Sequence, residues 1–245
     1  MDKRKRIKMY FESKPTVGII LAAIGFLLFI SSFSNEFNGG IFFFGLLMMA
    51  GGGFLIHKHF KDMPTDQQID AYLKEDLEDL GKKALSKFAI EQSQLTRQAV
   101  FITGPKLWDV AGARIAFKRG KDSNLRFNPI EVCVINFGAN QLLAYKCVFD
   151  FMTGNPLNES TDEYFYKDVV SVSTKTESKT VMFRNVQLQM NAAESFALTT
   201  SGGTSISVML KDPTLIQRMG GGVISTTLAE EATLAIRTIL REKKQ

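Results

Sequence analysis

Two long apolar runs dominate the hydrophobic pattern at the start of the chain. Val17–Phe33 and Gly39–Ile56 are 17 and 18 residues long, and neither contains a charged side chain. At about 1.5 Å per residue, each helix would span roughly 25 to 27 Å of a bilayer core about 30 Å thick. Because neither run has a polar face, we expect two transmembrane helices over 15–60, not a soluble buried hairpin. The five residues 34–38 allow only a tight turn, so both outer ends should lie on one side of the membrane.

Basic residues flank this hairpin and predict its orientation. The connecting turn carries only Glu36, whereas the two outer flanks carry Lys3, Arg4, Lys5, Arg6, Lys8, Lys14, Lys58 and Lys61. Because such residues favour the cytoplasmic side, the tail 1–14 and the C-terminal part should both be cytoplasmic. In a bacterium this describes a multi-pass protein of the inner (cytoplasmic) membrane. A cleaved signal peptide is disfavoured because a second apolar run follows at once.

Small residues recur on both predicted spans. Gly18, Ala22 and Gly25 lie on the first, and Gly45 lies on the second. Small side chains let backbones approach closely within a membrane, so we expect packing within the hairpin or between copies of the chain. No ionisable residue interrupts either run, which argues against a proton relay, an ion pump or a substrate carrier.

The pattern changes to helical periodicity in the linker segment 61–92. Apolar residues recur there at steps of three or four, at Ile69, Leu73, Leu77, Leu80, Ala84 and Phe88. This stripe predicts an amphipathic helix. Acidic residues crowd its early turns and lysines its later ones, as the helix dipole favours. The helix should pack on the following domain, although a coiled coil with a second copy is the alternative.

Short alternating runs fill most of residues 93–245 and predict an antiparallel β-domain. We expect seven or eight strands in a barrel or sandwich. The expected strands are 99–103, 114–118, 127–137, 141–151, 163–175, 181–190, 195–200 and 205–210. A closing helix should begin near the capping-box sequence Thr227–Glu230. The whole chain is therefore expected to be a membrane-anchored α+β protein.

Local strings in this domain resemble bacterial pleckstrin-homology-like domains. The string YFYKDVVSV at Tyr164–Val172 is similar to one of their strands, and Phe196–Leu210 is similar to the hairpin before their closing helix. The resemblance covers roughly residues 97–242, with an extra strand and a longer loop in the 150s. It implies a pleckstrin-homology-like fold. Family members with transmembrane hairpins are mostly scaffolds or binders of lipids and proteins.

Composition excludes several classes of protein. The chain is 45% hydrophobic with 20 Phe and only 2 Cys, so it is neither disordered nor rich in disulfides. The net charge of +5 comes from the membrane flanks, because residues 62–245 hold 22 basic and 22 acidic residues. This balance argues against a nucleic-acid partner.

Candidate catalytic chemistry is sparse. The only histidines, His57 and His59, lie at the membrane edge, so no histidine-dependent triad is available in the β-domain. Neither a metal site nor a cofactor is expected, and we expect no enzyme activity. Cys133 and Cys147 should face each other across a strand pair as core residues, with a redox pair as the alternative. Gly220–Gly222 should be an ordinary loop; phosphate binding is the alternative.

One basic cluster in the β-domain is a candidate anion- or lipid-binding loop. Five cations surround Gly120 with only Asp122 nearby in sequence: Arg114, Lys118, Arg119, Lys121 and Arg126. In lipid-binding members of the resembled superfamily, a basic loop between the first strands holds the anionic head group. A solvated turn without a ligand is the alternative.

These patterns favour a non-enzymatic scaffold or sensor held at the inner membrane. Its partners would be membrane lipids and either a protein bound by the β-domain or further copies of the chain. The alternative is a membrane effector, for example in antiphage defence. Its β-domain would sense a small ligand such as a signalling nucleotide, and its hairpins would assemble to disrupt the membrane.

Overall fold

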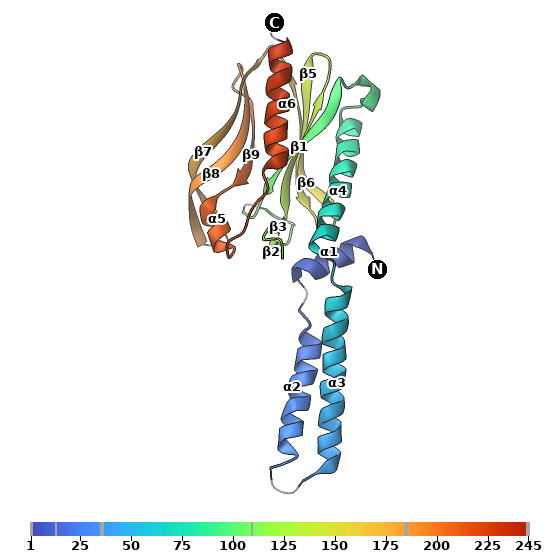
Figure 1. Ribbon diagram of the computed structural model, residues 1–245. Helices are drawn as coiled ribbons and strands as arrows, with labels where there is room; N and C mark the ends of the chain where they lie inside the picture. Colours follow the sequence, from blue (N-terminus) through green and yellow to red (C-terminus); the bar gives the residue numbers. More distant parts are fainter. Residues whose placement is uncertain (1, 13, 35–36, 109, 184–185, 244–245) are drawn as a thin grey trace. The chain divides into compact units, whose positions relative to one another are not determined.

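The computed structural model describes the whole chain except residues 1, 13, 35–36, 109, 184–185 and 244–245 (Figure 1). It divides into two compact units, Met1–Thr65 and Asp66–Gln245. The regular secondary structure described in the first unit is all helical, and the second contains all the described strands. This is the α+β arrangement expected from the sequence, with N-terminal helices followed by antiparallel sheets and a C-terminal helix.

Three helices form the first unit: α1 (Lys3–Glu12), α2 (Thr16–Ser31) and α3 (Gly39–Asp62). Helix α3 has 24 residues and is long and apolar enough to cross a membrane. It runs six residues beyond the predicted end at Ile56. Its first turn is capped by Asn38, whose side-chain oxygen accepts hydrogen bonds from the N–H groups of Gly40 and Ile41 at 3.1 and 3.2 Å.

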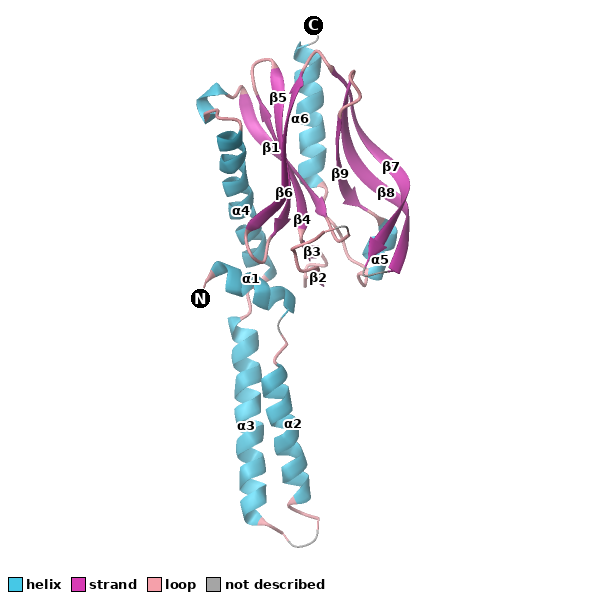
Figure 2. Cartoon of the chain, turned by 180° about the vertical axis from the view of Figure 1, so that it is seen from behind, coloured by secondary structure: helices cyan, strands magenta, loops and turns pink. Residues whose placement is uncertain are grey.

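Helix α2 is shorter than the span that the sequence predicts. It contains 16 residues and qualifies as a candidate span only together with α1. The expectation of two spans is therefore shown for α3 and not for α2 alone. The two helices nevertheless pack along each other as an antiparallel hairpin, as both views show (Figures 1 and 2).

The second unit is built on two antiparallel sheets. The first has the order β1-β4-β5-β6, and the second has the order β7-β8-β9. Strands β2 and β3 form a separate two-stranded hairpin. The strands are β1 (Arg97–Pro105), β2 (Ala116–Arg119), β3 (Leu125–Asn128), β4 (Ile130–Phe137), β5 (Gln141–Asp150), β6 (Asn155–Phe165), β7 (Val169–Phe183), β8 (Val186–Thr200) and β9 (Ser205–Lys211). Among the described residues the sheets do not join into a closed barrel.

Helices cover the four-stranded sheet on both sides. Helix α4 (Asp66–Lys87) lies along one face, and α6 (Thr227–Lys243) lies on the other face together with β7–β9 (Figures 1 and 2). The contact with α4 is close, because a Cβ added at Gly81 would lie 3.2 Å from the Phe101 ring. Packing of this helix on the domain is therefore confirmed. A short 3₁₀ turn, Gln92–Gln94, and helix α5 (Pro213–Arg218) complete the unit.

The main core lies between the two sheets and α6. Completely buried members include Ile102, Phe137, Phe196, Leu198 and Ile236. Helix α6 contributes an apolar stripe to this core, in which Ala232 and Ile239 are buried beside Ile236. A second core joins the β2–β3 hairpin to α5 and contains the only tryptophan, Trp108.

Several strand predictions were wrong for identifiable reasons. The predicted strand 127–137 is interrupted at Pro129, which has no N–H to donate to a sheet. The predicted strand 163–175 is divided between β6 and β7, which belong to different sheets. The break expected between the predicted strands 163–175 and 181–190 is only an irregularity at Glu177–Lys179 within the continuous strand β7. The first half of β6, residues 155–162, was missed because most of its side chains are polar and exposed.

The predicted cysteine pairing is also wrong. Cys133 lies opposite Lys146, and Cys147 lies opposite Val132, so the two cysteines point to opposite faces of the sheet. The hairpin register differs by one residue from the predicted one, and such a shift moves a side chain to the other face. Both thiols are free and buried. Burial raises the pKa of Cys133 to about 12 and that of Cys147 to about 11, which opposes a redox role.

Candidate functional site

The small residues predicted to pack the membrane hairpin lie in the contact between α2 and α3. A Cβ added at Gly25 would lie 2.8 Å from the Gly45 carbonyl oxygen. A Cβ added at Gly52 would lie 2.7 Å from the Gly18 carbonyl oxygen and 2.6 Å from the Ala22 nitrogen. The two backbones therefore touch at two levels, where any larger side chain would separate them. Gly52 is the middle residue of the glycine run 51–53 and is a main contact of this interface.

The predicted flanking cations lie in or beside the helices of the first unit. Helix α1 contains Lys3, Arg4, Lys5, Arg6 and Lys8, and Lys14 precedes α2. Lys58 and Lys61 belong to the last turns of α3. Five of the eight cations therefore lie in α1, and Lys14 lies just before α2. The other two lie in the helix that can span a membrane.

The candidate basic loop is a tight turn between β2 and β3. The N–H of Gly120 donates to the Asn124 carbonyl oxygen at 2.9 Å, and the N–H of Ser123 donates back to Gly120 at 3.1 Å. Lys118 and Arg126 lie opposite each other in the strand pair. The structure therefore brings Lys118, Arg119, Lys121 and Arg126 around one turn. Arg114 lies before β2, where its carbonyl oxygen accepts a hydrogen bond from Asn128 at 2.7 Å.

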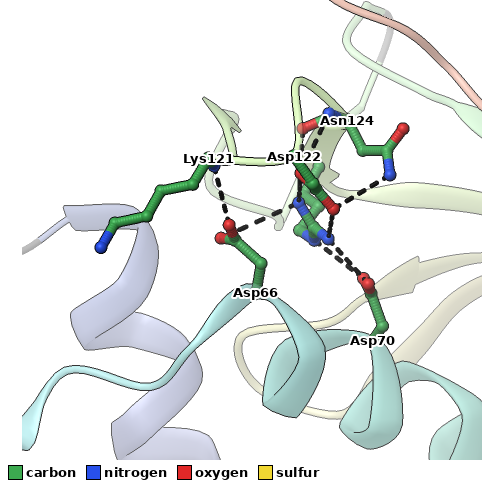
Figure 3. A network of polar contacts seen from close by, with 6 residues as sticks. Asp66, Asp70, Lys121, Asp122 and Asn124 are labelled. Atoms are coloured by element: carbon green, nitrogen blue, oxygen red, sulfur yellow. Dashed lines mark hydrogen bonds and ion pairs between the residues drawn. The ribbon is translucent and has the colours of Figure 1, made fainter.

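Arg126 is the buried centre of an ionic network, whose acidic members Asp66, Asp70 and Asp122 are labelled in Figure 3. Its side chain is 8% exposed. Its Nε and Nη2 atoms donate to the two carboxylate oxygens of Asp70 at 2.8 and 2.7 Å, in the paired geometry that guanidinium and carboxylate groups prefer. Asp122 accepts two more hydrogen bonds, at 3.1 and 2.8 Å. These bonds from Arg126 hold the pKa of Asp122 well below its usual range.

Asp66 completes the network from the first turn of α4. Its Oδ2 atom accepts a hydrogen bond from the backbone N–H of Lys121 at 2.7 Å, and its Oδ1 atom lies 3.9 Å from Nη1 of Arg126. Gly120 has no side chain at this point, and a Cβ there would contact Arg126 and lie 2.8 Å from Asp66 Oδ2. Burial lowers the pKa of Lys118, and Asp66 acts in the opposite direction.

This network changes the predicted charge of the loop. In the sequence one acid lies near the five cations, whereas the structure adds Asp66 and Asp70 from more than fifty residues earlier in the chain. Arg126 is therefore engaged and is not an open solvated cation. Arg119 has its own contacts, donating to the Gly220 carbonyl oxygen at 3.3 Å and to the Ser123 hydroxyl at 3.1 Å. In the sequence, Asp66 and Asp70 are recognisable only as early acidic residues that favour the helix dipole of α4.

Two amides of the glycine run 220–222 are already used within the chain. The N–H of Gly220 donates to Gln217 at 3.1 Å, and the N–H of Gly221 donates to Ile216 at 3.0 Å. All three glycines have positive φ angles, which glycine adopts without strain. The run therefore ends α5 and supplies a carbonyl to Arg119, as expected of an ordinary loop.

A shallow depression of about 340 Å³ lies where β6 turns into β7, beside the β8–β9 turn. Its lining is rich in carboxylates and hydroxyls but contains neither histidine nor cysteine. The lining residues are Glu163, Tyr164, Phe165, Asp168, Thr200, Ser201, Gly202 and Thr204. No set of three or more potential metal ligands of the His, Cys, Asp and Glu types occurs in the part of the chain that the structure describes.

Comparison with known proteins adds no assignment to this geometry. No family model matches the chain, and neither a curated protein nor a solved structure matches it.

Proposed function

We propose that the chain is a non-enzymatic scaffold or sensor, anchored in a membrane by α2 and α3, that holds a β-domain at the membrane surface. The observation that carries this proposal is the apolar exterior of the hairpin. Large side chains point outward from both helices, for example Val17, Leu27 and Phe43 at 72%, 67% and 70% exposure. Burying each such side chain away from water is worth about 1.5 to 3 kcal/mol, so a lipid environment is strongly favoured.

The fold of the second unit supports a binding role for this domain. The unit has antiparallel sheets followed by a C-terminal helix, and the pleckstrin-homology-like resemblance implies seven or eight antiparallel strands closed by such a helix. We therefore propose a pleckstrin-homology-like domain that carries α4 as an additional layer. A protein partner or an anionic lipid would bind this domain, while membrane lipids surround the hairpin.

The packing of the hairpin favours an anchor over a membrane-disrupting assembly. Gly18, Gly25, Gly45 and Gly52 all contact the other helix of the same chain. Their close-approach surfaces are thus already used within the hairpin. The effector hypothesis would need similar surfaces between copies of the chain, and it is accordingly the second candidate.

Thiol labelling in intact bacteria tests the proposed anchor and its orientation. Both native cysteines are buried, so a cysteine introduced at an exposed position reports on its own compartment. We expect a membrane-impermeant maleimide to label Phe37→Cys in intact cells and to label Lys243→Cys only after lysis. Labelling of Lys243→Cys in intact cells would contradict the proposed orientation. Recovery of both variants in the aqueous fraction would contradict the anchor.

A further inference from the structure

The β2–β3 loop has the donors of an oxyanion site, and those donors are already satisfied by this chain. The backbone N–H of Lys121 and the Nε and Nη2 atoms of Arg126 all donate to carboxylate oxygens of α4, at 2.7 to 2.8 Å. Asp66 and Asp70, one helical turn apart, are the acceptors. A guanidinium group that offers two parallel N–H donors fits a phosphate as well as a carboxylate.

The loop is shaped around these two carboxylates. Gly120 leaves room for Asp66, because a Cβ there would lie 2.8 Å from the carboxylate oxygen. Lys118, opposite Arg126 in the strand pair, adds a further positive charge beside the site. Asp122 belongs to the loop and accepts hydrogen bonds from Arg126, whereas Asp66 and Asp70 belong to helix α4. Without the first two turns of α4, Arg126 would keep the Asp122 carboxylate but lose both hydrogen bonds to Asp70, and the N–H of Lys121 would lose its acceptor.

The two α4 carboxylates remain partly accessible to solvent. The side chain of Asp70 is 55% exposed and that of Asp66 is 17% exposed, although Arg126 is only 8% exposed. Carboxylates that enter from the solvent side can be replaced without opening the core. An outside oxyanion would approach along the same path.

We propose that the β2–β3 loop is an oxyanion-binding site that the chain fills with its own α4 carboxylates, so that Asp66 and Asp70 mask it in the resting state. An outside phosphate-type oxyanion then binds only when these two carboxylates no longer occupy the donors of the loop. Asp66 lies four residues after Asp62, the last residue of α3, so the mask follows the candidate membrane span directly in the chain. The inference goes beyond the proposed anchor and does not depend on it.

Hydrogen–deuterium exchange of the full chain in an uncharged detergent tests this masking. The readout is the exchange rate of amides in residues 119–125, with and without inorganic phosphate. In the wild type we expect phosphate to leave this rate unchanged. In Asp66→Asn/Asp70→Asn, phosphate should slow the exchange about tenfold or more, because it restores charge-assisted hydrogen bonds that the substitutions removed.

A second arm distinguishes a free oxyanion from a lipid head group. The same variants are placed in nanodiscs of phosphatidylcholine alone or with phosphatidylglycerol, without added phosphate. Protection by inorganic phosphate alone identifies a soluble ligand, and protection by phosphatidylglycerol alone identifies a lipid head group. Either result supports the unmasked site. Protection in neither arm would overturn it.

A matched control separates masking from a change in net charge. Glu78→Gln/Asp79→Asn removes the same charge from exposed positions on the same helix, so it should behave as the wild type. An equal phosphate response in this control or in the wild type would overturn the proposal. Should the double variant fail to fold, Asp70→Asn decides alone, because it removes the carboxylate from the paired Nε and Nη2 donors of Arg126 while Asp66 and Asp122 still hold the loop. A phosphate response there supports masking, and its absence refutes masking.

Discussion

Replacing Arg126 by methionine should strongly destabilise the β-domain. The substitution keeps an apolar stem of similar length but removes a guanidinium that is 8% exposed and lies within 4 Å of three carboxylates. Breaking a buried ion pair costs about 3 to 5 kcal/mol. Two of the three carboxylates, on Asp70 and Asp122, are 55% and 40% exposed and can regain water. We therefore expect a smaller loss, about 2 kcal/mol in the free energy of unfolding.

Urea unfolding followed by tryptophan fluorescence measures this loss. Trp108, the only tryptophan, lies in the core that also contains Leu125 next to Arg126. With a slope of about 2 kcal/mol per molar urea, the midpoint should fall by about 1 M. The control is Arg119→Met in the same loop, whose guanidinium bonds only to a carbonyl and a hydroxyl among the contacts described above. Equal midpoints for the two variants would refute the assignment of Arg126 as the centre of the network.

Three further predictions concern the hairpin, the acid sensitivity and the cysteines. Gly52→Ala should lower the resistance of the hairpin to SDS-induced loss of helical circular dichroism by about 1 to 3 kcal/mol, because helix α2 must move away. Gly53→Ala should have little effect, since nothing lies within 4 Å of its Cβ position. Arg126 lowers the pKa of Asp122 in the folded state below the ordinary pKa of 3.8. The stability that this pair contributes is therefore complete above pH 3.8 and is lost as the pH falls through the lowered pKa of the folded state. The urea midpoint of the wild type should therefore fall more in acid than that of Asp122→Asn. Cys133 and Cys147 should react with maleimide only after unfolding, and fast labelling of the native protein would contradict their burial.

The helices were predictable because their signals are local. The stripe from Ile69 to Ala84 depends on side chains three or four positions apart, and α4 forms where that stripe predicts a helix. Likewise, uninterrupted apolarity identified α3. The length of α2 was overestimated because no charged residue interrupts the run before Phe33, whereas the helix ends at Ser31.

The sheet register and the ionic network were not predictable, because both depend on distant partners. A one-residue difference at the turn after Phe137 decides whether Cys147 lies on the same face of the sheet as Cys133, and the residue pattern fits either register. The charge around Gly120 depends on Asp66 and Asp70, which no local count near Arg126 includes. Polar strands such as the first half of β6 have no alternation to reveal them, because they lie at the sheet edge.

Alkaline carbonate extraction of membranes containing the full chain tests the central claim most directly. High pH releases proteins that are held only by polar contacts, whereas helices surrounded by lipid are retained. We predict that the chain stays in the membrane pellet. Release of the full chain into the supernatant would contradict the proposal that α2 and α3 anchor it in the bilayer.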